Sequence, residues 1–177
     1  MSLKATEDLN LEEIEMNINF AEMNENHQKE VMRIFNYYIE NSTAAFPSKA
    51  LPEQFFSMLV KKSEGYPSYT VLDNERVIGF CQLSAYNPFP TFSKTACLTY
   101  FIENEYTGKG IGSLCLKKLE DEAQKMNILH LIAEISSEND GSISFHKKHG
   151  YSLVGEMHDI GEKFGRKFGI VYMQKTL

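Results

Sequence analysis

The sequence predicts an α/β protein, a single domain with a mixed, twisted central sheet and helices on both faces. Two observations lead to this prediction. Short apolar segments typical of strands alternate along the chain with segments whose apolar residues recur at helical spacing. The chain has 177 residues, of which 42% are hydrophobic and 24% are charged, a size and composition that allow one globular domain with a sizeable core.

The first half of the chain predicts one strand, two helices and a hairpin. Residues 17–22 (NINFAE) indicate a strand, and apolar residues at helical spacing indicate a helix over about 26–40. Pro52 can open a second helix, because its fixed backbone angle fits the first helical turn. Residues 68–72 and 76–86 are two strand-like segments joined by a short polar turn, as expected of a hairpin.

The second half predicts four more strands around two helices. Residues 95–102 carry apolar side chains on both faces, which is typical of a buried strand. The preceding NPFPTF (87–92) is expected to be a loop, because its prolines disfavour a central strand. Residues 128–135, 151–160 and 168–177 indicate the remaining strands.

One helix of this half is predicted from a stripe of apolar residues, and the other from a residue that can cap its first turn. The stripe of apolar residues consists of Ile111, Leu114, Cys115, Leu119, Ala123 and Met126. Asn139 or Asp140 can cap the other helix, which is expected to end at Gly150.

Composition narrows the class of protein. The net charge of −6 argues against a protein that coats nucleic acid, and no apolar run is long enough to predict a membrane span. Residues 1–15 are expected to form a flexible tail without a signal peptide, and residues 16–177 the domain. The three cysteines lie far apart without a CxxC spacing, which favours free thiols in a reducing cytoplasm and no metal site.

The segment TGKGIGS (107–113) raises the question of function, because it places three glycines between a strand and a helix. A helix begins with unpartnered N–H groups, and glycines let this backbone approach an anion such as a pyrophosphate. The segment lacks the GxxxxGK[ST] pattern of a Walker loop, and Cys115 stands where a dinucleotide fingerprint has its third glycine. By itself the segment is equally consistent with a tight turn.

A second motif, NDGSISFHKKHGY (139–151), follows one strand later. The two motifs in this order resemble the pyrophosphate loop and the following helix of the GNAT superfamily of N-acetyltransferases. YYIENSTAAF (37–46) and GEKFGRKFGIVYMQ (161–174) resemble the phosphinothricin N-acetyltransferase branch of that superfamily. The resemblance extends over nearly all of the chain from residue 17, and it implies a GNAT-like fold with acetyl-CoA as co-substrate.

The resemblance implies a set of cofactor contacts. The strands 95–102 and 128–135 would separate around the pantetheine arm, with backbone groups of Phe101 and Ile102 holding it. The pyrophosphate would lie on the loop formed by Thr107, Gly108, Lys109, Gly110, Ile111, Gly112 and Ser113. The side chain of Asn139 would face the pantetheine or position a catalytic group.

Two residues are candidate proton carriers. Direct attack of an amine on a thioester needs a group that takes the amine proton, and a donor to the departing thiolate helps. His146 matches the position that is His in the phosphinothricin branch, and its imidazole can serve either role. Glu134 resembles the base of the ribosomal-protein acetylases, but a carboxylate on a solvated strand explains it equally well. His149 and His158 are expected on the surface.

The sequence departs from the branch at several positions. Thr107 replaces the usual Gln or Arg of the loop, and Cys97 stands where the branch has its catalytic Glu. Phe89 replaces an Arg suited to a substrate carboxylate, which argues against phosphinothricin itself as substrate. The candidate acceptor pocket is lined by Phe46, Tyr86, Phe89 and Phe92, and it favours an aromatic, aliphatic or weakly polar amine. Lys163 and Arg166 are candidate polar contacts.

These residues lead to one main function and two alternatives. The main expectation is an acetyl-CoA-dependent N-acetyltransferase, an acyltransferase that acts on a small amine or an amino-acid derivative. The alternatives are acetylation of a peptide N-terminus with Glu134 as base, and a non-catalytic acyl-CoA sensor. By analogy with the branch, a homodimer is expected, with GIVYM (169–173) as the candidate interface.

Overall fold

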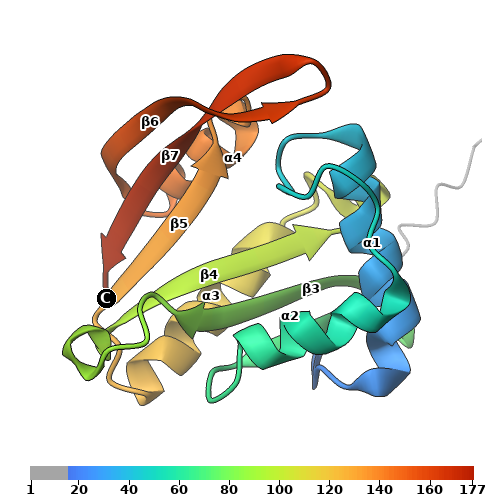
Figure 1. Ribbon diagram of the computed structural model, residues 1–177. Helices are drawn as coiled ribbons and strands as arrows, with labels where there is room; N and C mark the ends of the chain where they lie inside the picture. Colours follow the sequence, from blue (N-terminus) through green and yellow to red (C-terminus); the bar gives the residue numbers. More distant parts are fainter. Residues whose placement is uncertain (1–15) are drawn as a thin grey trace, which may run out of the picture.

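The computed structural model describes residues 16–177 and consists of one sheet with helices on both sides (Figure 1). The seven strands follow the order β1-β2-β3-β4-β5-β7-β6. Their bounds are Ile18–Glu22 (β1), Ser68–Asp73 (β2), Arg76–Ala85 (β3), Thr95–Ile102 (β4), His130–Ser136 (β5), Ser152–Lys163 (β6) and Arg166–Thr176 (β7). Because β4 and β5 run parallel while the other neighbours are antiparallel, the predicted mixed sheet is confirmed. The predicted tail, residues 1–15, lies outside the described residues.

The helices lie on the two faces as predicted. Their bounds are Gln28–Asn41 (α1), Phe56–Lys62 (α2), Ile111–Lys125 (α3) and Asp140–Lys148 (α4), and short 3-10 turns cover Glu25–His27, Glu53–Phe55, Pro90–Phe92 and Asn104–Tyr106. We call the face covered by α1 and α2 the α1 face, and the face covered by α3 and α4 the α3 face (Figure 1). None of the helices in this part of the chain is both long and apolar enough to cross a membrane.

Strand β4 divides the core in two, as its sequence pattern predicts. On the α3 face, Leu98 and Ile102 belong to a cluster with Leu119 of α3. On the α1 face, Phe101 packs against Phe35 of α1 and Phe80 of β3, with ring centroids 5.2 and 5.6 Å apart. The alternation of side chains along one strand therefore supplies both hydrophobic layers.

The apolar stripe expected on α3 needs a correction. Leu114 and Met126 are 46% and 40% exposed, whereas Leu116 is buried. The buried line runs through residues four apart, Ile111, Cys115 and Leu119, and at 100° per residue Leu116 lies beside it while Leu114 lies on the outer flank.

The candidate dimer segment 169–173 also needs a correction. It lies within β7, which is an internal strand flanked by β5 and β6. Most of its side chains are buried within this chain, so the segment cannot serve as a contact surface.

The feature that positions the site is a fork between β4 and β5. The two strands pair only where Thr95–Cys97 lie beside His130–Ile132. Beyond this point they diverge, and β4 stays with β3 while β5 stays with β7 (Figure 1). The backbone groups on the inner edges of the fork therefore point into a gap that the sheet does not fill.

Two substitutions on α3 test the corrected stripe. Leu119→Ala should lower the free energy of unfolding by about 2–5 kcal/mol, because it opens a cavity in the core. Leu114→Ala, on the exposed flank of the same helix, should change it by no more than about 0.5 kcal/mol. Urea denaturation of both variants gives the two values, and similar losses would contradict the stripe described above.

Candidate active site

The glycine-rich segment forms the turn into α3. Gly110 caps the helix with a φ of 83°, and Gly108 has a φ of 75°. Both angles lie in the left-handed region, which strains other residues. A Cβ added at either position would meet no atom within 4 Å, so there is room for a side chain. Glycine is required there because of the backbone angle. The result is an open space beside a helix N-terminus, which is the geometry of an anion site.

Two side chains of this segment have local roles. The Thr107 hydroxyl donates to the backbone oxygen of Asn104 at 2.7 Å, which closes the short turn before the loop. The Lys109 ammonium lies 5.1 Å from the centre of the Tyr106 ring. With Thr107 used in this way, the backbone amides of the first turn and the Lys109 charge are the groups that can hold an anion.

His149 is not the surface histidine that the sequence suggests. Its side chain is partly buried, and its Nε2 lies 3.0 Å from the Ser113 hydroxyl on the first turn of α3. No sequence pattern pairs two residues 36 positions apart, so only the fold reveals this contact. His158 does lie on the surface, beside Glu156.

His146 is buried on the α3 face, with 1% of its surface exposed. Its Nδ1 lies 2.8 Å from the backbone oxygen of Ser142, and its Nε2 lies 3.2 Å from the Tyr100 hydroxyl. Because a carbonyl oxygen only accepts, Nδ1 carries the proton and Nε2 accepts from Tyr100. Burial lowers the pKa of His146, while the bond to Ser142 partly raises it, so the imidazole is neutral near pH 7.

Tyr100 is the residue that the sequence analysis passed over. It lies on β4 past the last residue paired with β5, on the α3 face, and its side chain is partly buried. Burial raises the pKa of Tyr100, so the phenol keeps its proton at neutral pH. The available signal was its hydroxyl on a strand face that otherwise carries only Ala96, Leu98 and Ile102.

Asn139 caps α4. Its side-chain oxygen accepts from the backbone N–H of Ser142 at 3.1 Å, which fixes the turn of helix that carries His146. The backbone oxygen of Ile102, another predicted contact, accepts from the Tyr38 hydroxyl at 2.6 Å and keeps a second lone pair for other donors.

Glu134 lies on the opposite face of the sheet from His146. It is exposed, and along β5 it follows His130 and Ile132 on the side that faces away from α3. Its partner on β7 is Tyr172, whose pKa is raised by burial and then by the Glu134 charge. The two candidate catalytic residues therefore cannot act as one hydrogen-bonded pair.

Cys97 occupies the last paired position of the fork, on the same face as Glu134. Burial and the nearby Glu134 charge raise the pKa of this thiol to about 11, against a smaller lowering by Lys62. Near neutral pH Cys97 is therefore a thiol, and it replaces the expected carboxylate with a group that takes up no proton.

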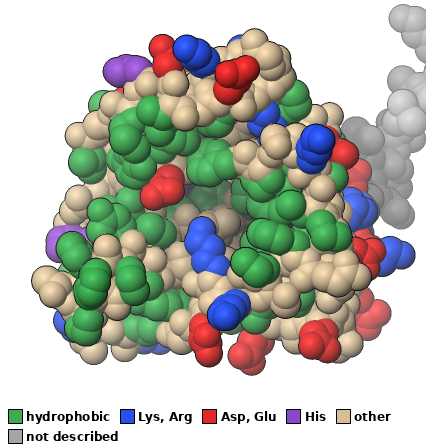
Figure 2. Space-filling model, in the orientation of Figure 1, with side chains coloured by type: hydrophobic (Ala, Val, Ile, Leu, Met, Phe, Trp, Pro, Cys, Tyr) green, Lys and Arg blue, Asp and Glu red, His purple; other side chains and the backbone are tan. Residues whose placement is uncertain are grey.

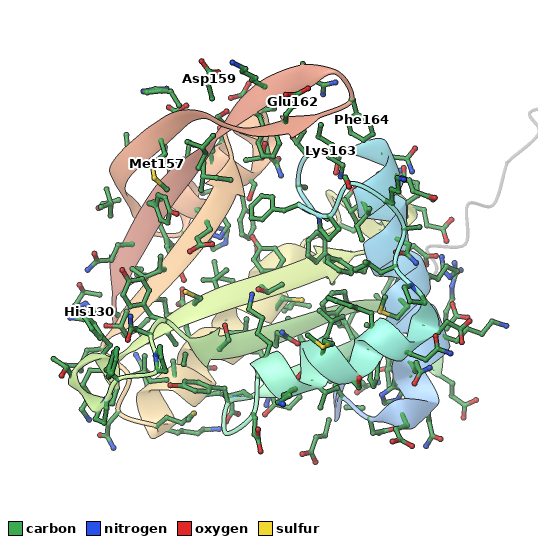
Figure 3. The ribbon with its side chains drawn as sticks, viewed as in Figure 1. His130, Met157, Asp159, Glu162, Lys163 and Phe164 are labelled. Atoms are coloured by element: carbon green, nitrogen blue, oxygen red, sulfur yellow. The ribbon has the colours of Figure 1, made fainter. Side chains whose placement is uncertain are left out.

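A cleft of 540 Å³ opens on this face, across the paired part of the fork. It is lined by Tyr86, Phe92, Thr95, His130, Ile132, Val154, Gly155, Glu156, Met157, Tyr172 and Gln174. Figure 2 shows this face hollowed, with hydrophobic side chains and also acidic and basic ones around the hollow, and Figure 3 places His130 and Met157 on the β5 and β6 sides of the cleft. None of the lining residues is a lysine or an arginine.

The structure brings together two of the four residues predicted for the acceptor pocket. Tyr86 and Phe92 lie edge to face, 5.7 Å apart, and both line the cleft. Phe89 is 67% exposed and does not line it. Phe46 stacks on Phe168 instead, 6.3 Å away. No sequence pattern marks the β5 side of the cleft, and the places of Met157 and Tyr172 depend on the pairing of β6 and β7.

The polar residues of the tail motif hold two segments together. The Lys163 ammonium is buried and donates to the backbone oxygens of Ser42 and Ala45, at 2.8 Å each, so the tip of the β6–β7 hairpin is fixed to the end of α1 (Figure 3). Burial lowers the pKa of Lys163. Arg166 forms two bonds to Glu138, at 2.7 and 3.0 Å. Both cations already have partners within the protein.

A forked pair of parallel strands, with an anion-binding helix N-terminus on one side and an open cleft on the other, defines an enzyme that transfers an acyl group from a coenzyme A thioester. The chain belongs to the acetyltransferase (GNAT) family, whose model matches residues 31–151. The resemblance of the two sequence motifs is thereby confirmed.

Three known proteins illustrate the similarity. An L-methionine sulfoximine/L-methionine sulfone acetyltransferase of Pseudomonas paraeruginosa is 27% identical over 83% of this chain and 87% of its own. A ribosomal-protein-alanine N-acetyltransferase structure from Brucella melitensis is 25% identical, covering 90% of this chain and 99% of its own, with a TM-score of 0.84. A phosphinothricin acetyltransferase from Sinorhizobium meliloti, solved with AcCoA, has a TM-score of 0.86 at 24% identity over 92% of this chain and 89% of its own, and supports the fold alone.

The raised pKa of Cys97 predicts slow reaction with thiol reagents. A pKa of about 11, against an ordinary value of 9.0, makes the thiolate about 100-fold scarcer at pH 8, so Ellman's reagent should label Cys97 at least that much more slowly than a small thiol. The rate should rise as the pH increases towards 11. Cys97→Ser is the control for the assignment, and fast labelling of Cys97 at pH 7 would contradict the described environment.

Proposed function

We propose that the protein transfers the acetyl group of acetyl-CoA to the primary amine of a small, amino-acid-like acceptor. The observation that carries the proposal is the fork, because it joins the anion-binding loop on the α3 face to the cleft on the α1 face. The similarity to a methionine sulfoximine acetyltransferase supports an acceptor of this size.

The cofactor would lie along the α3 face. Its diphosphate would bind to the amides of residues 108–112 with Lys109 beside it, since the Ser113 amide already donates to the Gly110 backbone oxygen, and its pantetheine arm would enter the fork. There the backbone groups of Phe101 and Ile102 would hold the arm and polarise the thioester carbonyl. Asn139 contributes by fixing the first turn of α4.

The reaction would use one residue set on each side of the fork. On the α1 face, Glu134 takes the proton of the attacking ammonium, directly or through water. The amine nitrogen then bonds to the thioester carbon and loses its second proton to solvent, and the carbon–sulfur bond breaks. On the α3 face, in the resting site, the Tyr100 hydroxyl donates its one proton to His146 Nε2, so His146 holds the phenol in place and is a positioning residue. During the reaction this O–H turns from His146 to the departing thiolate, Tyr100 keeps its proton, and solvent then protonates the thiolate.

Removing the Tyr100 hydroxyl should separate turnover from binding. Tyr100→Phe should lower kcat about 10- to 100-fold, because the thiolate loses its hydrogen-bond donor, while the Kd of acetyl-CoA changes less than about 3-fold. His146→Ala should behave similarly, and the double variant should be little worse than either single one. Coenzyme A release gives kcat, and isothermal titration gives Kd. Equal losses in both quantities would make the two residues binding groups.

Replacing Glu134 should act on the acceptor half of the reaction. Glu134→Gln should lower kcat/KM for the amine about 100-fold or more, without changing the affinity for acetyl-CoA. Glu162→Gln, an exposed carboxylate at the tip of the β6–β7 hairpin, is the matched control. A Glu134→Gln variant with normal kcat/KM would rule out this carboxylate as the proton acceptor.

Peptide N-terminal acetylation is the second candidate, favoured by the likeness to the ribosomal-protein-alanine N-acetyltransferase structure. The loop between β3 and β4 argues for a small acceptor, because Tyr86 and Phe92 at its two ends narrow the cleft. Kinetics with alanine-initiated peptides and with free amino acids distinguish the two. Binding of acetyl-CoA with no transfer to any amine would instead indicate the acyl-CoA sensor.

We further propose a cytoplasmic protein without a nucleic-acid partner, which the three free cysteines and the net charge of −6 support. For the expected homodimer, the edge strand β6 is a better contact surface than β7. It carries exposed apolar side chains outside the cleft lining at Leu153 and Ile160. Light scattering in solution measures the oligomeric state.

A further inference from the structure

The end of α4 touches the first turn of α3 through two neighbouring side chains. His149, the residue that ends α4, approaches the Ser113 hydroxyl with its Nε2 at 3.0 Å. The Phe145 ring lies beside Gly112, where an added Cβ would be 3.5 Å from the ring. The His149 and Phe145 rings are themselves 4.2 Å apart. The same turn of α3 follows the glycines of the anion-binding loop.

The hydrogen bonds of His149 have a defined direction. Its Nδ1 lies 2.9 Å from the backbone oxygen of Phe145, which only accepts, so Nδ1 carries a proton. In the neutral ring Nε2 then accepts from the Ser113 hydroxyl. One imidazole thus connects the last turn of α4 to the first turn of α3, and its ring orientation is fixed at both nitrogens.

We propose that His149 is a positioning residue for the diphosphate of acetyl-CoA. By holding Ser113 while Phe145 packs on Gly112, it keeps the first turn of α3 at a fixed distance from α4. The loop amides therefore already point to the position of the diphosphate before the cofactor binds. The inference rests on the proposed function. It assigns to His149 a contribution to the affinity for the diphosphate part of the cofactor and none to the acetyl transfer itself.

Three replacements separate this contact from the packing of α4. His149→Gln places a polar group near the position of Nε2 and should retain the bond to Ser113. His149→Asn reaches only as far as Nδ1, and His149→Ala reaches neither partner. Loss of one hydrogen bond that orders the loop should raise the Kd of acetyl-CoA roughly 3- to 10-fold in the Ala and Asn variants and less than about 2-fold in the Gln variant.

A shortened donor tests whether the effect belongs to the diphosphate. S-acetylpantetheine has the same thioester arm and no diphosphate, so its Kd should be equal in the wild type and all three variants. Isothermal titration measures acetyl-CoA, and NMR titration measures the weaker donor. Ser113→Ala combined with His149→Ala should be no worse than the single His149→Ala variant.

Each result has a distinct meaning. A rise in Kd for acetyl-CoA alone, restored by His149→Gln, supports the proposal. Equal rises in Kd for both donors would overturn it, since His149 would then act through the whole fold. Unchanged binding in His149→Ala would also overturn it, since His149 would then contribute nothing to the affinity. If the wild type binds acetyl-CoA but acetylates no amine, the proposed function fails while this comparison of Kd values stands. If the wild type does not bind acetyl-CoA, both are wrong.

Discussion

The structure depends on one constraint, which is that β4 and β5 pair over only three positions and then separate. Each strand is secured on its other side, β4 by β3 and β5 by β7, so the sheet stays intact while an inner edge of unpaired backbone opens. Such an edge is costly unless something donates and accepts hydrogen bonds there. An amide-containing cofactor arm can do so, and the anion-binding turn at the start of α3 lies on the same face to hold the other end of that cofactor.

The fork also explains why the candidate catalytic groups do not touch one another. Side chains on successive positions of a strand point to opposite faces. Tyr100 therefore meets His146 on the α3 face, whereas Glu134 joins Cys97 and Tyr172 on the open one. Burial raises the pKa of Tyr100 and lowers that of His146, so the phenol is protonated and the imidazole neutral near pH 7, while the Glu134 carboxylate is exposed. The sheet thus separates a buried environment on the α3 face from an exposed one on the α1 face. The gap between β4 and β5 connects the two.

Much of the fold could be predicted from the sequence, because it depends on periodicity and on local turn chemistry. The strand 95–102 matches β4 at both ends, and the Asn139 cap and the glycine turn are where short-range rules place them. The errors come from long-range geometry. Whether Leu114 or Leu116 faces the core depends on how α3 lies on the sheet, and the His149–Ser113 contact depends on how α3 and α4 meet. Phe46 and Phe89 are expected in the pocket from their aromatic rings and, for Phe89, from the resemblance to the branch. In the structure Phe46 stacks on Phe168, and Phe89 is exposed on a loop.

The buried Lys163 ammonium limits which side of the cleft can open. It satisfies the backbone oxygens of Ser42 and Ala45 at the end of α1, and pulling the hairpin away would leave both the charge and these oxygens without partners. Because Lys163 fixes the β6–β7 hairpin to the end of α1, these two segments do not move apart to open the cleft. The part of the cleft lined by Tyr86, Phe92 and Met157 can adjust more easily, because its side chains are aromatic rings and a flexible thioether.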